Sequence, residues 1–195
     1  MKKYFFVLLV LAIAAPQFLV AQSYEIDKGH SAVLMKVQRF GVVNVIGRFG
    51  EVAGTIHYNS DEISGTSINI SVETDSYRAN NLAGETSAMS PAFLDAATYP
   101  TLSFTASEVK AADGGIEITG NLTIHGVTKE IKFEANIIGP LVDLPTRKQS
   151  VALQGTLWIN RLDYGVGPDR NLPDGREIIG NKVQIDLEIL AIATE

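Results

Sequence analysis

The chain has 195 residues, contains no cysteine, and carries 22 acidic against 16 basic side chains, which gives a formal net charge of −6. The lack of cysteine excludes disulfides, a thiol nucleophile, thiolate metal ligands and a lipoprotein anchor on cysteine. Adjacent basic side chains occur only at Lys2-Lys3 and Arg147-Lys148, so composition disfavours nucleic acid and anionic membrane surfaces as partners.

The first 21 residues have the features of a secretory signal peptide. A basic start is followed by an apolar segment over residues 5–15 and by small residues that end at Ala21. Pro16 interrupts the apolar stretch, which is shorter than the about 20 residues of a transmembrane helix. We therefore expect residues 1–21 to be removed on export and residues 22–195 to form one domain. The mature protein is expected to be periplasmic or secreted, without a stable membrane anchor.

From residue 23 onward, apolar and polar side chains alternate in at least eight segments, which is the pattern of half-buried strands. Gly47, Gly50 and Gly54 interrupt the long second segment and indicate bends or bulges. Long strands with a single apolar face favour a closed barrel, which has no exposed sheet edge, over a sandwich. The predicted fold class is therefore all-β. The alternating segments are 33–38, 45–58, 68–73, 102–107, 116–119, 130–135, 151–159 and 183–189.

The strongest hairpin signal is the segment Gly120-Asn121-Leu122-Thr123-Ile124-His125-Gly126-Val127-Thr128-Lys129. Alternating residues flank it on both sides, so we expect two antiparallel strands that are joined by a glycine-bounded turn. His125 is interpreted as a turn residue at the tip of this hairpin.

Two segments without alternation, residues 77–100 and 161–181, are longer than hairpin loops usually are. In the first, Ser90-Pro91 has the sequence of a helix N-cap and first helical residue, which predicts a short helix over residues 92–97. Such a helix would plug one end of a barrel. The second contains turn residues over 168–175 and no apolar period, so we expect an irregular flap.

The sequence contains no recognisable catalytic or metal-binding motif. His30, His57 and His125 lack the close spacing of a zinc site. No Gly-x-Ser-x-Gly elbow, phosphate-binding loop or dinucleotide-binding glycine motif occurs. His30 is interpreted as a polar residue that hydrogen-bonds a turn before a strand. We therefore expect no catalytic residue, no metal and no cofactor, and we do not expect an enzyme.

An apolar cavity inside the barrel is the remaining candidate site, and a barrel filled by its own side chains is the alternative. Each buried methylene contributes about 0.8 kcal/mol, whereas association costs about 4–15 kcal/mol. A retained guest therefore needs a long apolar chain. Small residues at inward positions would leave room for it: Gly47, Ala106, Gly120 and Gly155.

Several separated motifs resemble those of the YceI-like polyisoprenoid-binding proteins, in order from residue 24 to about residue 192. Besides the hairpin segment, they are Asp27-Lys28-Gly29-His30-Ser31, Val45-Ile46-Gly47-Arg48-Phe49, Phe93-Leu94-Asp95-Ala96 with Tyr99-Pro100, and Ile159-Asn160-Arg161-Leu162-Asp163-Tyr164-Gly165, where the family pattern has Phe at Tyr164. The resemblance implies an extended antiparallel eight-stranded β-barrel, lipocalin-like in shape, whose channel holds a polyisoprenoid or similar long-chain lipid without catalysis.

This chain departs from the family pattern at two places. Arg39-Phe40 stands where many members have a histidine after the first strand, and Arg78-Ala79-Asn80-Asn81-Leu82 replaces a more polar Arg-Asp-x-His-Leu. Both changes remove polar groups that could lie near a lipid head group.

The resemblance and the strand parity together predict the ligand-binding side chains. Arg78 and Arg161 are candidates for head-group contacts, because guanidinium groups suit phosphate or carboxylate. The alternative for both is a structural ion pair or a loop clamp, for example Arg161 with Asp163. A bulge near Gly47 or Gly155 would exchange inward and outward positions. The predicted lining residues are Val33, Met35, Val37, Phe49, Phe104, Leu122 and Phe133, with Phe93 and Leu94 closing one end.

The predicted function is the binding and shielding or transport of a long-chain isoprenoid lipid, of the quinone or polyprenyl type. One alternative is an accessory factor or enzyme that acts on a lipid head group, which needs Arg78, Arg161 or His30 to converge on the cavity mouth. Another is a stress-related interaction module with a filled core. A homodimer is one of the oligomeric states that the sequence leaves open.

Overall fold

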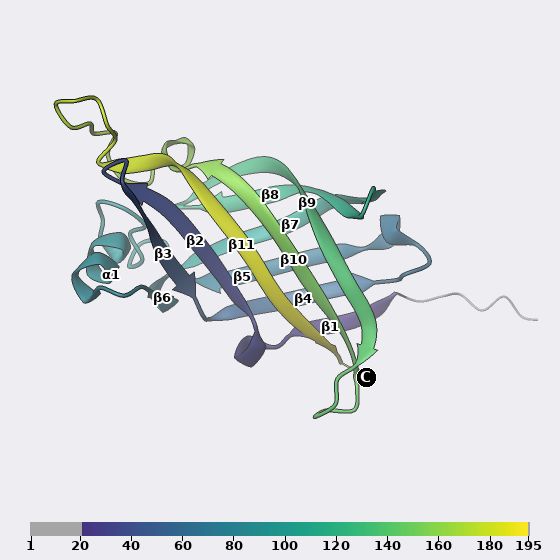
Figure 1. Ribbon diagram of the computed structural model, residues 1–195. Coiled ribbons are helices and arrows are strands. Elements are labelled where there is room, and N and C mark those ends of the chain that lie inside the picture. The colour runs from purple at the N-terminus through teal and green to yellow at the C-terminus, as the bar shows by residue number, and fades with distance from the viewer. Residues whose placement is uncertain (1–20, 195) are drawn as a thin grey trace, which may run out of the picture.

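The computed structural model describes residues 21–194, and antiparallel strands make up most of them (Figure 1). Residues 1–20 of the expected signal peptide lie outside the described residues. Within 21–194, no helix has the length and hydrophobicity that crossing a bilayer requires. The strands are β1 (Gln22–Ile26), β2 (Ala32–Arg39), β3 (Val43–Phe49), β4 (Val52–Tyr58), β5 (Ser67–Glu73), β6 (Tyr77–Arg78), β7 (Thr101–Ala112), β8 (Gly115–Ile124), β9 (Val127–Val142), β10 (Gln149–Asn160) and β11 (Ile179–Ala193). The α-helix is α1 (Leu82–Met89), and the short 3-10 helices are η1 (Lys28–His30), η2 (Ile63–Gly65), η3 (Thr74–Ser76) and η4 (Arg161–Tyr164).

These strands occupy eight positions around a closed barrel, because three positions are each filled by a broken strand. β1 and β2 pair with opposite ends of β11, β4 and β3 pair with β1 and β2, and β5 and β6 pair with β4 and β3. The breaks lie at η1, at Gly50-Glu51 and at η3. The predicted eight-stranded antiparallel barrel is therefore confirmed.

The predicted hairpin is present as β8 and β9. Ile124 pairs with Val127, so His125 and Gly126 form a two-residue turn. Their φ angles of +51° and +74° are both positive, as a type I′ turn requires. Of the three glycines predicted to interrupt the second segment, Gly50 lies at the break between β3 and β4, whereas the ladders continue through Gly47 and Gly54 without a register shift.

The helix lies in the 77–100 connection, as predicted, but at different residues. α1 begins after Asn81, whose side chain accepts a hydrogen bond from the Ala83 N–H at 3.1 Å. Ser90 follows the last helical turn and donates its hydroxyl to the Ser87 carbonyl at 2.7 Å. The prediction over residues 92–97 was wrong because Asn81 caps a helix as well as serine does. Pro91 marks the end of the helix rather than its beginning.

The strand parity continues through both doubtful glycines. Val45, Gly47 and Phe49 stay on the inner side of β3, while Ile46 is exposed. On β10, alternation likewise continues through Gly155 to Leu157. The register shifts lie elsewhere, between Ser150 and Ala152 in the β9–β10 ladder, between Ala106 and Glu108 in the β7–β8 ladder, and between Ile179 and Val183 in the β11–β2 ladder.

One half of the barrel is filled by side chains. Its residues come from β1, β4, β5, β8, β10 and the second half of β11, and several are almost completely buried. Tight packing of this kind stabilises one end of the barrel without leaving space for a guest. The largest of these side chains are Tyr24, Val52, Ile56, Ile68, Ile118, Val151, Leu153 and Ile189.

Two glycines, one within β3 and one at the break between β3 and β4, allow local packing to be tested. A methyl group at Gly47 would collide with the ring of Tyr77, which also contacts Phe49 at 5.2 Å between ring centroids. No atom lies within 4 Å of the corresponding position at Gly50. We expect Gly47→Ala to lower the free energy of unfolding by about 1–3 kcal/mol, as measured by urea denaturation. Gly50→Ala, the control, should change it by less than about 1 kcal/mol. Equal effects of the two substitutions on the free energy of unfolding would contradict the close contact between Gly47 and the Tyr77 ring.

Candidate functional site

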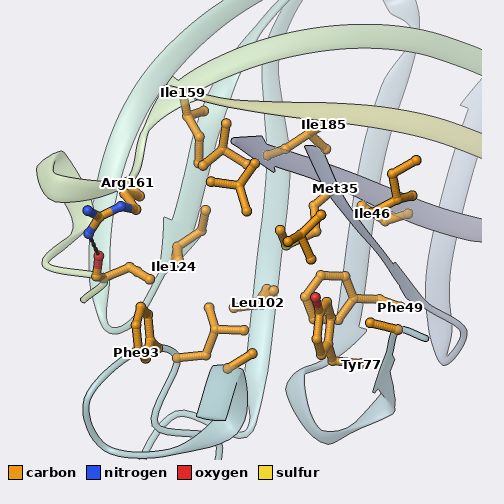
Figure 2. Close-up of a pocket in the computed structure, with 18 of the residues that line it drawn as sticks. Met35, Ile46, Phe49, Tyr77, Phe93, Leu102, Ile124, Ile159, Arg161 and Ile185 are labelled. Carbon is orange, nitrogen blue, oxygen red and sulfur yellow. Dashed lines mark hydrogen bonds between the residues drawn. The ribbon is translucent and has the colours of Figure 1, made fainter. Parts of the chain in front are cut away.

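The other half of the barrel is hollow. A cavity of about 800 Å³ is enclosed by β2, β3, β5 and β7 to β11, and by the connection that contains α1. Its size lies in the range typical of ligand pockets, and most of its wall is apolar. Figure 2 shows side chains from several of these elements around it: Met35, Ile46, Phe49, Tyr77, Phe93, Leu102, Ile124, Ile159, Arg161 and Ile185.

The structure brings all nine of the predicted ligand-binding side chains to this cavity. Alternate residues of β2 supply one wall, and residues of β7, β8 and β9 supply the opposite one. Phe104 and Phe133 contact each other edge to face, with 5.6 Å between ring centroids. Their role in binding a ligand stays a prediction. The nine residues are Val33, Met35, Val37, Phe49, Phe93, Leu94, Phe104, Leu122 and Phe133.

Sequence reasoning missed other parts of the wall. Ile185 of β11 pairs with Met35 of β2, so the parity of β2 could have identified the inward side of β11. Tyr77 also lines the cavity, but it lies in an irregular connection where no periodicity marks inward positions. The missed aliphatic residues of β5 and β11 are Ile70, Val72, Ile179, Val183, Ile185 and Leu187.

The small inward residues do not enlarge the cavity, contrary to the expectation from sequence. The Tyr77 ring covers Gly47, and a Cβ at Gly120 would lie 2.5 Å from Cζ of Phe104. Small residues thus allow neighbouring side chains to approach the strand, and the space they leave is filled. None of the four positions is part of the cavity lining: Gly47, Ala106, Gly120 and Gly155.

The cavity has its mouth between β3 and α1. β6 pairs only with Arg48 and Phe49 of β3, so residues 43–47 have no strand neighbour on that side within the described part of the chain. Exposed residues from both sides of this interruption line the cavity. They are Val43, Asn44 and Ile46 from β3 and Asn80, Asn81, Ala83, Gly84 and Ser87 from the region of α1.

Arg161 lies at the start of η4 and lines the cavity, but its guanidinium is engaged within the protein. The side chain is 4% exposed. Nε donates to the Gly180 carbonyl at 3.1 Å, and Nη1 donates to the Val166 carbonyl at 2.7 Å. Nη2 donates to the carbonyls of Pro168 and Ile179, each at 3.0 Å, and to Asn181 Oδ1 at 2.8 Å. These contacts define a loop clamp that joins η4 and the flap to the start of β11.

The electrostatic surroundings of Arg161 differ from the predicted ion pair. Its hydrogen bonds go to the acceptors of the loop and not to Asp163. Burial lowers the pKa of the guanidinium, and the charges of Asp169 and Glu177 oppose this shift. The residue stays protonated because arginine titrates far above neutral pH.

The other two polar candidates are not among the residues that line the cavity. Arg78 is exposed and donates Nη1 to the carbonyls of Asp75 and Tyr77 at 2.8 and 2.7 Å. The His30 ring is 73% exposed and contacts Asp27 Oδ2 at 2.7 Å, so it is a turn residue as interpreted. Arg78, Arg161 and His30 therefore do not converge on the cavity mouth. No group of three or more potential metal ligands occurs among residues 21–194.

Tyr164 places a buried polar atom behind the apolar end of the site, although it is not itself one of the lining residues. Its side chain is 2% exposed and packs with Ile124 and Val166, next to Phe93 of the cavity wall. Among the described residues, its hydroxyl has no hydrogen-bond partner. Burial raises the pKa of the phenol, and the charge of Asp163 adds to the shift. The hydroxyl is thus a buried polar group that burial leaves without compensation.

The fold and the cavity define a class of protein: a small antiparallel barrel that is densely packed at one end and holds an apolar site at the other. The family model of the YceI-like domain matches residues 24–191. The chain belongs to the YceI-like family.

Relatives and solved structures agree with this assignment. A UPF0312 protein of Vibrio vulnificus is 31% identical over 184 residues, which cover 93% of this chain and 92% of the relative. The crystal structure of Burkholderia cenocepacia BcnA has a TM-score of 0.74 at 20% identity and covers 85% of this chain and 98% of its own. A polyisoprenoid-binding domain from Saccharophagus degradans, implicated in plant cell wall breakdown, has a TM-score of 0.66 at 19% identity, with 89% of this chain and 99% of that domain covered. The two structures show a similar fold.

Replacing Arg161 distinguishes a loop clamp from a head-group contact. Lysine keeps the charge but cannot reach all the acceptors that the guanidinium contacts. We expect Arg161→Lys to lower the free energy of unfolding by about 2–3 kcal/mol, as measured by chemical denaturation. The exposed control Arg78→Lys should stay within about 0.5 kcal/mol of the original protein. Unchanged stability with weakened lipid binding would instead assign Arg161 to a head group.

Replacing Tyr164 tests whether its hydroxyl lacks a partner in the free protein. A buried, unpaired hydroxyl is destabilising, so Tyr164→Phe should raise the free energy of unfolding by about 1 kcal/mol. Thermal and chemical denaturation of the ligand-free protein measure this change. A loss of stability would show that the hydroxyl is hydrogen-bonded in the folded state.

Proposed function

We propose that the protein is a non-catalytic carrier that binds a long-chain isoprenoid lipid, of the quinone or polyprenyl type, with its tail in the cavity. The observation that supports this most directly is the apolar cavity of about 800 Å³, which coexists with dense packing elsewhere in the same barrel. The carrier would shield the tail from water and leave the lipid chemically unchanged.

The energetics favour a long tail over a small apolar guest. A tail with about 20 buried carbons would contribute roughly 16 kcal/mol from hydrophobic transfer alone, at about 0.8 kcal/mol for each methylene. That exceeds the cost of association, about 4–15 kcal/mol, whereas a guest with five or six carbons does not exceed it reliably. The edge-to-face pair of Phe104 and Phe133 adds polarisable surface that suits the unsaturated units of an isoprenoid.

The comparisons support the class of ligand. The Saccharophagus degradans domain is described as polyisoprenoid-binding, and its fold is similar to that of this chain. The proposed site of action is the periplasm or the extracellular medium. This location depends on the first 21 residues, whose sequence has the basic, apolar and small-residue regions of a signal peptide.

The geometry favours a carrier over the two alternatives. The enzyme alternative needs Arg78, Arg161 or His30 to converge on the cavity mouth, yet Arg78 and His30 lie outside the cavity lining and Arg161 is held by the loop. A filled-core module accounts for the packed half of the barrel but not for the hollow half.

The first test is the identification of a copurifying lipid. The protein is expressed with its leader, purified without detergent and extracted with organic solvent for mass spectrometry. We expect one isoprenoid lipid at about one molecule per protein chain or dimer. An extract without lipid, repeated after incubation with quinones and polyprenols, would overturn the proposed function.

Two substitutions on α1 test the location of the tail. Ala88 lines the cavity, whereas Thr86 is exposed and its hydroxyl donates to the Leu82 carbonyl. Ala88→Phe should occupy part of the tail site and weaken lipid binding at least about tenfold, which corresponds to about 1.4 kcal/mol. Thr86→Phe adds the same ring outside the cavity and should leave the affinity unchanged. Equal affinities in both variants, with folding retained, would exclude this cavity as the tail site.

A further inference from the structure

Large exposed apolar side chains surround the mouth of the cavity. Val42 lies in the turn between β2 and β3, Val43 and Ile46 lie on β3, and Leu82 is the first residue of α1. We call these four residues the mouth rim. Val42 is 73% exposed and Leu82 is 78% exposed. Val43 and Ile46 also line the cavity, so apolar surface continues from the interior to the outside of the barrel.

The segments that form the mouth rim carry mainly positive charge. Arg39, Arg48 and Arg78 are all exposed. No acidic residue occurs between residues 36 and 50. In the segment 77–90 the acidic residue is Glu85, which is buried and accepts a hydrogen bond from the Ala79 N–H at 2.7 Å.

The adjacent flap contributes charges of both signs. Its Asp174 forms an ion pair with Arg176 at 2.6 Å, and Arg176 also donates to the Phe40 carbonyl at 3.0 Å. Exposed charges that lie more than about 8–10 Å from the mouth have little effect there, because salt at physiological concentration screens them. The negative net charge of the whole chain therefore does not describe the surface around the mouth.

We propose that the mouth rim docks reversibly on the surface of a lipid bilayer, so that an isoprenoid tail passes between the bilayer and the cavity without crossing water. This inference rests on the proposed carrier function. Valine, isoleucine and leucine enter the boundary between head groups and acyl chains, while the arginines contact lipid phosphates. Docking through these residues places the open side of the cavity against the membrane.

The charge distribution favours a bilayer over a second copy of the chain. A symmetric dimer through this surface would bring Arg39, Arg48 and Arg78 close to the same residues of the other copy. Like charges in such an interface are unfavourable. An anionic bilayer complements them, and it is also where a water-insoluble tail resides.

The chain provides a matched control at the other end of the barrel. Ile138, Leu141, Val142 and Leu144 are exposed, and Leu144 has the same exposed fraction as Val42, 73%. They belong to β9 and to the β9–β10 connection, which lies beside the C-terminal end of β11 in Figure 1. The mouth instead lies beside the start of β11, where Ile179 pairs with Arg39. None of the four control residues lines the cavity.

The experiment compares two double variants of the mature protein. Val42→Asp with Leu82→Asp changes the mouth rim, and neither residue lines the cavity. Leu141→Asp with Leu144→Asp changes the opposite end. Flotation with vesicles of phosphatidylcholine and phosphatidylglycerol measures association with a bilayer. The affinity of the rim variant for the vesicles should be at least about tenfold lower than that of the original protein. The control variant should bind the vesicles as strongly as the original protein does.

A charge substitution provides a second readout. Arg48→Gln should weaken association with the same vesicles by about fivefold at low salt. The difference from the original protein should shrink at high salt, because the lipid phosphates are then screened. An effect of Arg48→Gln that does not depend on salt would contradict the phosphate contact.

Binding of a short, water-soluble isoprenoid quinone in solution separates this inference from the proposed function. If the original protein does not bind this probe, the carrier function fails. If it binds the probe but does not associate with vesicles, or if both double variants associate equally, docking through the mouth rim is overturned. If the original protein sediments as a dimer and the rim variant as a monomer, while both associate equally with vesicles, the mouth rim binds a second copy of the chain. That result would likewise overturn docking on a bilayer.

Discussion

The hollow half of the barrel depends on a gap in the backbone hydrogen bonding between neighbouring strands. β6 consists of two residues that pair with β3, and β5 supplies the ladder to β7. Beyond this point the wall between β3 and β7 is covered by the connection that contains α1. A ladder holds neighbouring strands about 4.8 Å apart, whereas a connecting segment can stand away from the barrel axis. The cavity, its mouth and the exposed edge of β3 all follow from this one break.

The two halves of the barrel have different roles. The packed half has almost fully buried residues from several strands, such as Ile56, Ile68 and Leu153. Burial of this apolar surface stabilises the fold independently of any guest. The hollow half shares the long strands β7 to β11 with the packed half, and the β7–β8, β8–β9 and β10–β11 ladders extend along both halves, whereas the β9–β10 ladder ends at Ala135 and Gly155. A cavity can therefore persist in a barrel whose stability comes mainly from the opposite end.

Much of the architecture could be predicted from the sequence, because alternation reports which face of a strand is buried. Parity predicts that Met35, Phe104 and Phe133 face the interior, where they line the cavity, and the glycine of His125-Gly126 predicts the turn between β8 and β9. The helix was misplaced because Asn81 and Ser90 are both suitable N-caps, and only tertiary packing selects between them. The shape of the cavity could not be predicted, since periodicity does not reveal that the Tyr77 ring fills the space over Gly47.

The same interruption determines which part of the wall can move to admit a long tail. β2 is held to β3 by a ladder without a register shift and to β11 by a ladder that shifts only between Ile179 and Val183, so displacing it would break many backbone hydrogen bonds together. The connection opposite is held largely by local bonds, such as Leu94 N–H to the Ala88 carbonyl at 2.9 Å and Asp95 N–H to the Ser90 carbonyl at 3.0 Å. Such bonds move with the segment and are not lost when it shifts as a unit. Local opening is least costly where the fewest long-range bonds must break, and α1 with the turns that follow is therefore the part of the wall through which a tail can enter.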